Sequence, residues 1–170
     1  PEQYGGGGMN YVCYGVVARE VERVDSGYRS MMSVQSSLVM VPINEFGTEA
    51  QRETLLPPIT RGESFFAIGM SEPDSGSDLA SIRTRAIAVE GGFELTGAKV
   101  WTSQAHRANY AINLCRTAPA AEKDRHHGLS QLIVDLKSPG VSARPIRNLA
   151  GELDFNEVVF EDALVPDDYL

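Results

Sequence analysis

The sequence predicts an α+β protein in which helices come first and strands follow. Two observations carry this prediction. Apolar residues recur at helical spacing through the first sixty residues, and short apolar segments bounded by turn residues recur after Gly62. Short strands at regular intervals are typical of an antiparallel barrel or sandwich. We therefore expect an all-helical segment over residues 1–62 and a β-barrel or sandwich over residues 63–170.

The first two helices are predicted from their spacing and their boundaries. Asn10 can cap a helix over residues 11–24, and the Asp-Ser-Gly segment at residues 25–27 should interrupt it. A second helix is expected over residues 28–40. It should end at Val41-Pro42, because a residue that precedes proline avoids the α region.

A third, shorter helix is predicted from a capping box. Thr48 and Gln51 have the spacing at which the side chain of each accepts a hydrogen bond from the backbone of the other. The helix should run over residues 49–56 and stop at Pro57-Pro58, since proline lacks the N–H that a helix interior requires.

The second part of the chain has the residue pattern of short strands separated by turns. Residues 86–96 are typical of a hairpin around the Gly91-Gly92 turn. The other expected strands are residues 65–70, 99–103, 110–116, 129–136, 141–146 and 155–160.

Composition excludes two classes of protein. The formal net charge of −8 is unsuited to a nucleic-acid binder, which must neutralise a row of phosphates. No run of 18 apolar residues is present to form a membrane-spanning helix. Cys13 and Cys115 lie far apart and form no C-x-x-C motif, so we expect two buried thiols in a reducing compartment.

A loop of unusual composition follows the first expected strand. Residues 69–78, GMSEPDSGSD, combine two glycines, a proline and three serines. Such a loop can offer backbone N–H groups and hydroxyls to an anionic or polar ligand, and a plain polar turn is the alternative. Asp78 should cap a short helical turn over residues 79–82.

Four motifs in this order resemble the acyl-CoA dehydrogenase family. SEPDSGSD at residues 71–78 is similar to the family signature T/S-E-P-x-A/S-G-S-D, and GAKVWTS at residues 97–103 is similar to G-x-K-x-W-I-T. PEQYGG at residues 1–6 and the segment at residues 155–166 resemble the family's P-E-E-Y-G-G turn and the end of its middle domain. Together the motifs span the whole chain.

The resemblance implies an FAD site built from the two glycine-containing motifs. Ser77 would also contact the CoA part of the substrate. A flat indole face and nearby hydroxyls suit a flavin ring, although a tryptophan buried in the core is the alternative for Trp101. The residues that the resemblance implies for the cofactor are Ile68, Gly69, Met70, Ser71, Gly76, Ser77, Trp101, Thr102 and Ser103.

The helical part also resembles the glutaryl-CoA dehydrogenases. In that subfamily the arginine and serine of a G-Y-R-S motif hold the distal carboxylate of the substrate, which implies this role for Arg29 and Ser30. Glu22 would be their polar partner. A guanidinium binds a carboxylate through two parallel hydrogen bonds. Residues 103–109 and 149–158 look instead like general acyl-CoA dehydrogenases, so a short-chain or branched-chain substrate stays open.

The family's reaction implies parts that we expect outside this chain. A glutamate of a C-terminal helical domain removes the α-proton of the thioester in this family, the β-hydrogen leaves as a hydride to the flavin, and electrons pass to an electron-transfer flavoprotein. The sequence stops near the end of the middle domain, so that glutamate is expected to be absent. A homotetramer in the bacterial cytoplasm or the mitochondrial matrix is implied for the full-length enzyme. A related flavin oxidase or monooxygenase, or a truncated non-catalytic family member, stays an alternative.

Other clusters of polar residues carry weaker functional hypotheses. His126-His127 lies in a charged loop with no cysteine nearby, and we expect no metal site there. Glu72, Asp74 and Asp78 are close enough in sequence to suggest paired carboxylates, but satisfying backbone N–H groups of the loop explains them better.

Overall fold

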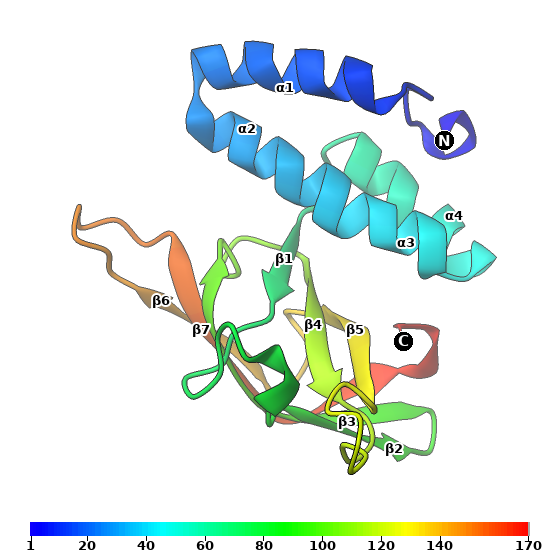
Figure 1. The fold of residues 1–170 in the computed structure, drawn as a ribbon, viewed down its shortest axis with the longest axis vertical. Coiled ribbons are helices and arrows are strands. Elements are labelled where there is room, and N and C mark those ends of the chain that lie inside the picture. Colours follow the sequence, from blue (N-terminus) through cyan, green and yellow to red (C-terminus); the bar gives the residue numbers. More distant parts are fainter. Residues whose placement is uncertain (170) are drawn as a thin grey trace. The chain divides into compact units, whose positions relative to one another are not determined.

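The computed structural model describes residues 1–169 and divides the chain into two compact units. The first comprises Pro1–Phe65 and the second begins at Phe66. Figure 1 shows that the first is helical and that the second is built on a strongly curled sheet. The predicted α+β fold, with helices before strands, is confirmed. Within residues 1–169, no helix is long and apolar enough to cross a membrane.

The first unit is a set of consecutive helices. Asn10 caps the first long helix as predicted, because its Oδ1 accepts hydrogen bonds from the backbone N–H groups of Val12 and Cys13. Asp25 ends that helix and caps the next through the N–H groups of Gly27 and Tyr28. The elements are η1 (Glu2–Tyr4), α1 (Tyr11–Val24), α2 (Ser26–Ser33), η2 (Val34–Met40), α3 (Val41–Phe46) and α4 (Glu49–Thr60).

The prediction that the second helix ends at Val41-Pro42 is wrong. The helical path continues through Pro42 to Phe46. The segment before it, η2, is a π-helix, and Val41 N donates to the carbonyl of Ser36, five residues earlier. In a regular α-helix the proline ring would clash with the carbonyl four residues before it. The wider π turn opens the hydrogen-bond ladder at this point and so lets the helix pass the proline.

The predicted stop at Pro57-Pro58 is also wrong, because α4 runs through both prolines to Thr60. The capping box of Thr48 and Gln51 that starts α4 is confirmed. Burial explains the continuation: Leu55, Leu56 and Ile59 are at most 6% exposed and keep the helix packed against the rest of its unit. This packing outweighs the loss of two N–H donors.

Cys13 does not have the buried thiol that was expected. It is exposed on α1, whereas Cys115 is buried. The reason is that α1 contributes no buried residue within the described chain, and its apolar side chains Tyr11, Val12 and Val24 are largely exposed.

The second unit is one seven-stranded sheet. The strands are β1 (Phe66–Gly69), β2 (Arg85–Val89), β3 (Gly92–Ser103), β4 (Tyr110–Arg116), β5 (Leu129–Asp135), β6 (Val141–Ile146) and β7 (Phe155–Pro166). They pair in the order β1-β4-β2-β3-β7-β6. The remaining strand, β5, lies outside this path and pairs with β4. The hairpin predicted at Gly91-Gly92 joins β2 and β3.

The sheet differs from a wholly antiparallel one at β4. This strand lies parallel to β1 over four residue pairs and touches β2 in parallel at a single pair. The residues after Gly69 leave the sheet as a loop before β2, so β1 has no sequence neighbour with which it forms a hairpin. The two strands predicted at residues 93–96 and 99–103 form one long strand, β3, because its pairing with β7 continues across two irregularities.

The core of the second unit is one cluster of buried residues contributed mainly by its strands. Its largest members, Leu95, Leu132, Val134, Val158 and Phe160, are at most 1% exposed. Along β3 and β7 the buried residues are separated by exposed or half-buried ones, as expected for strands with one buried face, whereas Leu132, Ile133 and Val134 of β5 are buried in succession.

Candidate functional site

The loop between β1 and β2 is held by a buried ion pair. Lys99 of β3 is 0% exposed, and its Nζ lies 2.9 Å from Glu72 Oε1 and 3.1 Å from the carbonyl oxygen of Met70. The Glu72 carboxylate also accepts hydrogen bonds from the backbone N–H groups of Arg83 and Thr84, at 2.6 and 2.9 Å. The Glu72 side chain therefore connects the start of the loop to its end at Arg83 and Thr84, and Lys99 ties it to β3.

The electrostatics of Glu72 favour its charged form. Burial acts to raise its pKa, but hydrogen bonds from Thr84, the Arg83 backbone and Lys99 outweigh it, so the pKa of Glu72 lies below its usual range. The predicted role of Glu72 in satisfying backbone N–H groups is confirmed. A buried charge of this kind is tolerated only because it is paired and hydrogen-bonded.

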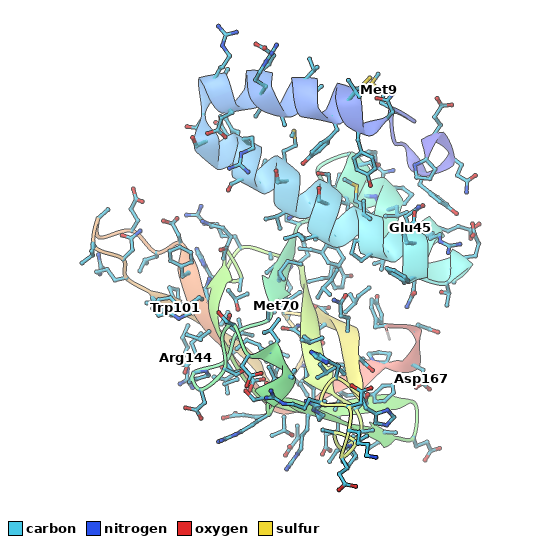
Figure 2. All side chains as sticks on the ribbon, viewed as in Figure 1. Met9, Glu45, Met70, Trp101, Arg144 and Asp167 are labelled. Carbon is cyan, nitrogen blue, oxygen red and sulfur yellow. The ribbon has the colours of Figure 1, made fainter. Side chains whose placement is uncertain are left out.

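The two segments that the sequence singled out lie side by side. Besides the Lys99 contact to Met70, the backbone N–H of Val100 donates to the carbonyl of Ser71 at 2.9 Å. The start of the loop at residues 70–72 thus runs along β3 at residues 99–100. Segments almost thirty residues apart in sequence therefore lie side by side, and Figure 2 labels Met70 on one of them and Trp101 on the other.

Gly69 sits where no side chain fits. A Cβ atom at this position would lie 1.9 Å from Asn113 Oδ1 and 3.2 Å from Lys99 Cγ. Asn113 on β4 is fully buried, and its Oδ1 has no hydrogen-bond partner within residues 1–169. The buried amide and lysine stem therefore require a glycine at the end of β1.

The rest of the loop is polar and open. Ser75 is buried and fixes the turn, because its hydroxyl donates to the carbonyl of Asp78 at 2.6 Å and its backbone exchanges hydrogen bonds with Glu72. Gly76 and Ser77 are exposed. Of the other predicted contact residues, Ile68, Met70 and Ser71 are half-buried.

Asp78 does not cap the turn at Leu79–Ser81 as predicted. No hydrogen bond joins its side chain to the start of that turn, and both of its carboxylate oxygens accept instead from Arg125 Nη2, at 3.0 and 2.8 Å. The hydrogen bonds from Arg125 hold the pKa of Asp78 below its usual range. The strong guanidinium partner explains why the carboxylate leaves the backbone of its own turn.

Trp101 projects from the sheet. It is 59% exposed and makes an edge contact with Phe155, with ring centroids 6.3 Å apart. This exposure excludes a core tryptophan. Ser103 is also exposed, whereas Thr102 between them is 1% exposed and its Oγ1 has no hydrogen-bond partner within the described chain. Trp101 and Ser103 thus present their side chains outward, and Thr102 faces the interior.

In the first unit, Arg29 and Glu22 form an ion pair. Arg29 Nε lies 2.7 Å from Glu22 Oε2, and Glu22 Oε1 also accepts from the hydroxyl of Ser26. Hydrogen bonds from Ser26 and Arg29 hold the pKa of Glu22 below its usual range. The Arg29 Nη1 group lies 3.4 Å from Ser33 Oγ, while Ser30 is exposed. The pair joins α1 to α2 across the break at Asp25.

Sequence reasoning missed the buried residues that hold the site. Lys99 was recognised only as one letter of a motif, and Asn113 and Asn156 were not singled out. One signal was present for Lys99: it lies an even number of residues after Leu95 on a strand whose inner face is apolar. No local pattern marks Asn156, because its partner Thr102 lies 54 residues away on β3.

Comparison with known proteins establishes the family. Residues 1–63 match the model of the acyl-CoA dehydrogenase N-terminal domain, and residues 67–163 match that of the acyl-CoA dehydrogenase middle domain. The chain belongs to the acyl-CoA dehydrogenase family. Members of this family are FAD-dependent oxidoreductases.

Individual relatives agree with this assignment. Acyl-CoA dehydrogenase FadE34 of Mycobacterium tuberculosis is 46% identical over 126 residues, which cover 74% of this chain. A glutaryl-CoA dehydrogenase of Mycobacterium smegmatis, solved with FADH2, is 33% identical over 98% of this chain with a TM-score of 0.86. The Tcur3481-Tcur3483 steroid ACAD is 34% identical over 99% of this chain with a TM-score of 0.88. The chain spans only 17% of FadE34 and 42% of each of these two structures.

The residues of the second unit suit the flavin that the family uses. An exposed indole, an exposed hydroxyl at Ser103 and the polar loop at residues 71–77 lie along the surface that Lys99 and Glu72 hold together. The indole offers an apolar face, and the hydroxyls and backbone groups offer hydrogen bonds to a polar ring edge or a phosphate.

Proposed function

We propose that the complete protein containing these residues oxidises an acyl-CoA thioester to its α,β-unsaturated product with FAD. Family membership supports the reaction class. The observation that carries the site is the contact between the two motif segments, in which Lys99 bonds both Met70 and Glu72. It makes one surface from the sequences that the resemblance assigns to the flavin.

We propose that the flavin contacts the outward-facing residues of this surface. Trp101 would cover one face of the ring, and Ser103 and Ser71 would hydrogen-bond its polar edge. The exposed Ser77 would also contact the CoA part of the substrate. Thr102 would contribute less through its side chain, because that side chain is buried. The full proposed set is Ile68, Gly69, Met70, Ser71, Gly76, Ser77, Trp101, Thr102 and Ser103.

We propose glutaryl-CoA as the substrate, with its distal carboxylate bound by Arg29 and Ser30. The ion pair with Glu22 supports this proposal because it uses Nε, and the only bond described for the outer edge is the long 3.4 Å contact of Nη1 with Ser33 Oγ, which a carboxylate could replace. Glu22 would orient Arg29 and balance its charge before the substrate arrives. The glutaryl-CoA dehydrogenase of M. smegmatis at 33% identity is a further support.

A substrate with a larger acyl group is the second candidate. The steroid ACAD is as similar to this chain as the glutaryl-CoA dehydrogenase is, with 34% against 33% identity. A short- or branched-chain acyl group is a further alternative to glutaryl-CoA. Each lacks a distal carboxylate in the position of glutarate, so Arg29 would then be an ordinary residue paired with Glu22.

The remaining parts of the reaction follow the family. We propose that a glutamate outside these 170 residues removes the α-proton and that an electron-transfer flavoprotein accepts the electrons. We also propose a homotetramer, in the cytoplasm of a bacterium or the matrix of a mitochondrion. A non-catalytic truncated family member is the alternative, and an activity assay of the complete protein distinguishes the two.

The substrate proposal is tested with Arg29→Ala in the complete protein. We expect kcat/KM for glutaryl-CoA to fall by roughly a hundredfold, the loss of a charge-assisted pair worth about 2–3 kcal/mol, while kcat/KM for butyryl-CoA changes little. The matched control is Arg23→Ala, because Arg23 on α1 is paired with Glu20 and is more exposed. Equal losses on both substrates would remove the dicarboxylate assignment, and a larger acyl-CoA panel would then decide the second candidate.

A further inference from the structure

The segment that carries Trp101 is held in a strained backbone conformation. Trp101 has φ of 60° and Gln104 has φ of 56°, both in the left-handed region that residues with a side chain rarely adopt. The pairing of β3 with β7 shifts between Lys99 and Thr102, where β3 has one more residue than its partner strand. This is a β-bulge, and it lies within the proposed flavin surface.

The bulge decides which way Trp101 faces. Leu95 and Lys99 are both buried, and they lie an even number of residues apart along β3. Unbroken alternation would therefore turn Trp101 inward as well. The extra residue gives the next buried position to Thr102, and it leaves Trp101 and Ser103 exposed on either side of it.

Three consecutive residues of β7 and its preceding loop hold the bulge. Asp154 accepts from Gln104 twice, through its carbonyl at 2.7 Å and its Oδ1 at 3.0 Å. Phe155 meets the edge of Trp101. Asn156 is 0% exposed, and its Nδ2 donates to the carbonyl of Thr102 at 3.0 Å. A strained segment persists only where its surroundings determine it in this way.

His106 completes the arrangement around Asn156. Its Nδ1 lies 3.0 Å from Asn156 Oδ1. The carbonyl of Thr102 can only accept, so the amide nitrogen of Asn156 must face Thr102 and its oxygen must face His106. Nδ1 of His106 therefore carries a proton and donates. The order of donors runs from His106 through Asn156 to Thr102.

We propose that Asn156, oriented by His106, is a positioning residue that keeps the bulge in the conformation in which Trp101 and Ser103 face the flavin. The role rests on the proposed function, since it needs Trp101 to contact FAD. Asn156 touches neither the flavin nor the substrate in this proposal. It acts through the backbone of Thr102.

A double-mutant cycle for FAD affinity tests the proposal in the complete protein. Asn156→Asp keeps the size of the side chain and the acceptor for His106 but loses the donor to Thr102. We expect it to raise the Kd for FAD tenfold or more, measured by titrating the apoprotein and following flavin fluorescence. In a Trp101→Ala background, which itself raises the Kd, Asn156→Asp should raise it by a clearly smaller factor than in wild type, because part of its effect passes through Trp101 and only the part through Ser103 is left.

A second pair of variants covers the case in which Asn156→Asp folds poorly. His106→Ala removes the donor to Asn156 and should weaken FAD binding, whereas His106→Asn places an amide N–H near the position of Nδ1 and should restore it. The positioning role would be overturned if Asn156→Asp raised the Kd for FAD by the same factor with and without Trp101. It would also be overturned if His106→Ala bound FAD as tightly as wild type does. Unchanged FAD affinity in Trp101→Ala would instead overturn the flavin contact itself and, with it, this proposal.

Discussion

Lys99 Nζ lies 2.9 Å from Glu72 Oε1, and the side chain of Lys99 is completely buried. The pair joins the middle of β3 to the loop that follows β1, and so it joins the two sequence motifs of the family. Neither residue faces outward, and the surface proposed for the flavin is made by their neighbours. We regard this pair as the element that gives the loop one conformation before any ligand binds.

Lys99→Met should destabilise the protein strongly. The variant keeps most of the side-chain volume but leaves the buried Glu72 carboxylate without its cation, a change that typically costs about 3–5 kcal/mol. Urea unfolding at neutral pH measures the loss. Lys137→Met, at an exposed lysine after β5, is the matched control and should change the free energy of unfolding by less than about 0.5 kcal/mol. A loss below about 1 kcal/mol in Lys99→Met would contradict the structural role of the pair.

Glu72 should make stability depend on pH in the acid range. Its pKa in the folded state lies below its usual value, so its contribution is present above the unfolded pKa of about 4.3 and is lost as the pH falls through the folded pKa. Unfolding free energies measured from pH 7 to pH 3 should decline less steeply below about pH 4.3 in Glu72→Gln than in wild type. Glu90→Gln, at an exposed acid in the β2–β3 turn, separates the general effect of losing one negative charge. Parallel profiles for Glu72→Gln and wild type would refute the assignment.

Gly69→Ala should be costly although only one methyl group is added. The new Cβ would lie 1.9 Å from Asn113 Oδ1, so the buried amide or the strand must move, and overpacking of this kind costs about 1–3 kcal/mol. Gly15→Ala is a control of the opposite sign. A Cβ there meets nothing within 4 Å, and alanine should stabilise the interior of α1 by about 0.5–1 kcal/mol. Thermal unfolding of both variants measures these changes in stability. An unchanged stability of Gly69→Ala would contradict the prediction and show that the Asn113 side chain moves aside at little cost.

Local sequence signals predicted the helix starts and the strands well. Asn10 and the Thr48–Gln51 capping box are decided by residues within three positions of each other, and both were confirmed. Proline was the weak signal. Pro42 and Pro57 lie inside helices, because a π turn and the burial of neighbouring leucines outweigh the intrinsic preference of proline to end a helix.

The sequence predicted which two segments form the candidate site, but not which buried residues hold them together. The motif letters singled out two segments as a candidate flavin surface, and the structure brings those segments together through the hydrogen bond from Val100 to Ser71. The buried partners could not be read from local pattern, because Lys99 meets Glu72 across 27 residues and Asn156 meets Thr102 across 54. Such contacts depend on strand register, which the sequence specifies only through the whole sheet.

The central claim is that the surface formed by residues 69–77 and 99–103 binds FAD, and titration of FAD onto Trp101 variants of the complete apoprotein tests it most directly. We predict that Trp101→Ala raises the Kd and shifts the visible absorption of bound flavin, that Trp101→Phe retains most of the affinity because it keeps an aromatic face, and that Ile87→Ala, an exposed apolar control on β2, behaves as wild type. An unchanged Kd and an unchanged flavin spectrum in Trp101→Ala would contradict the account.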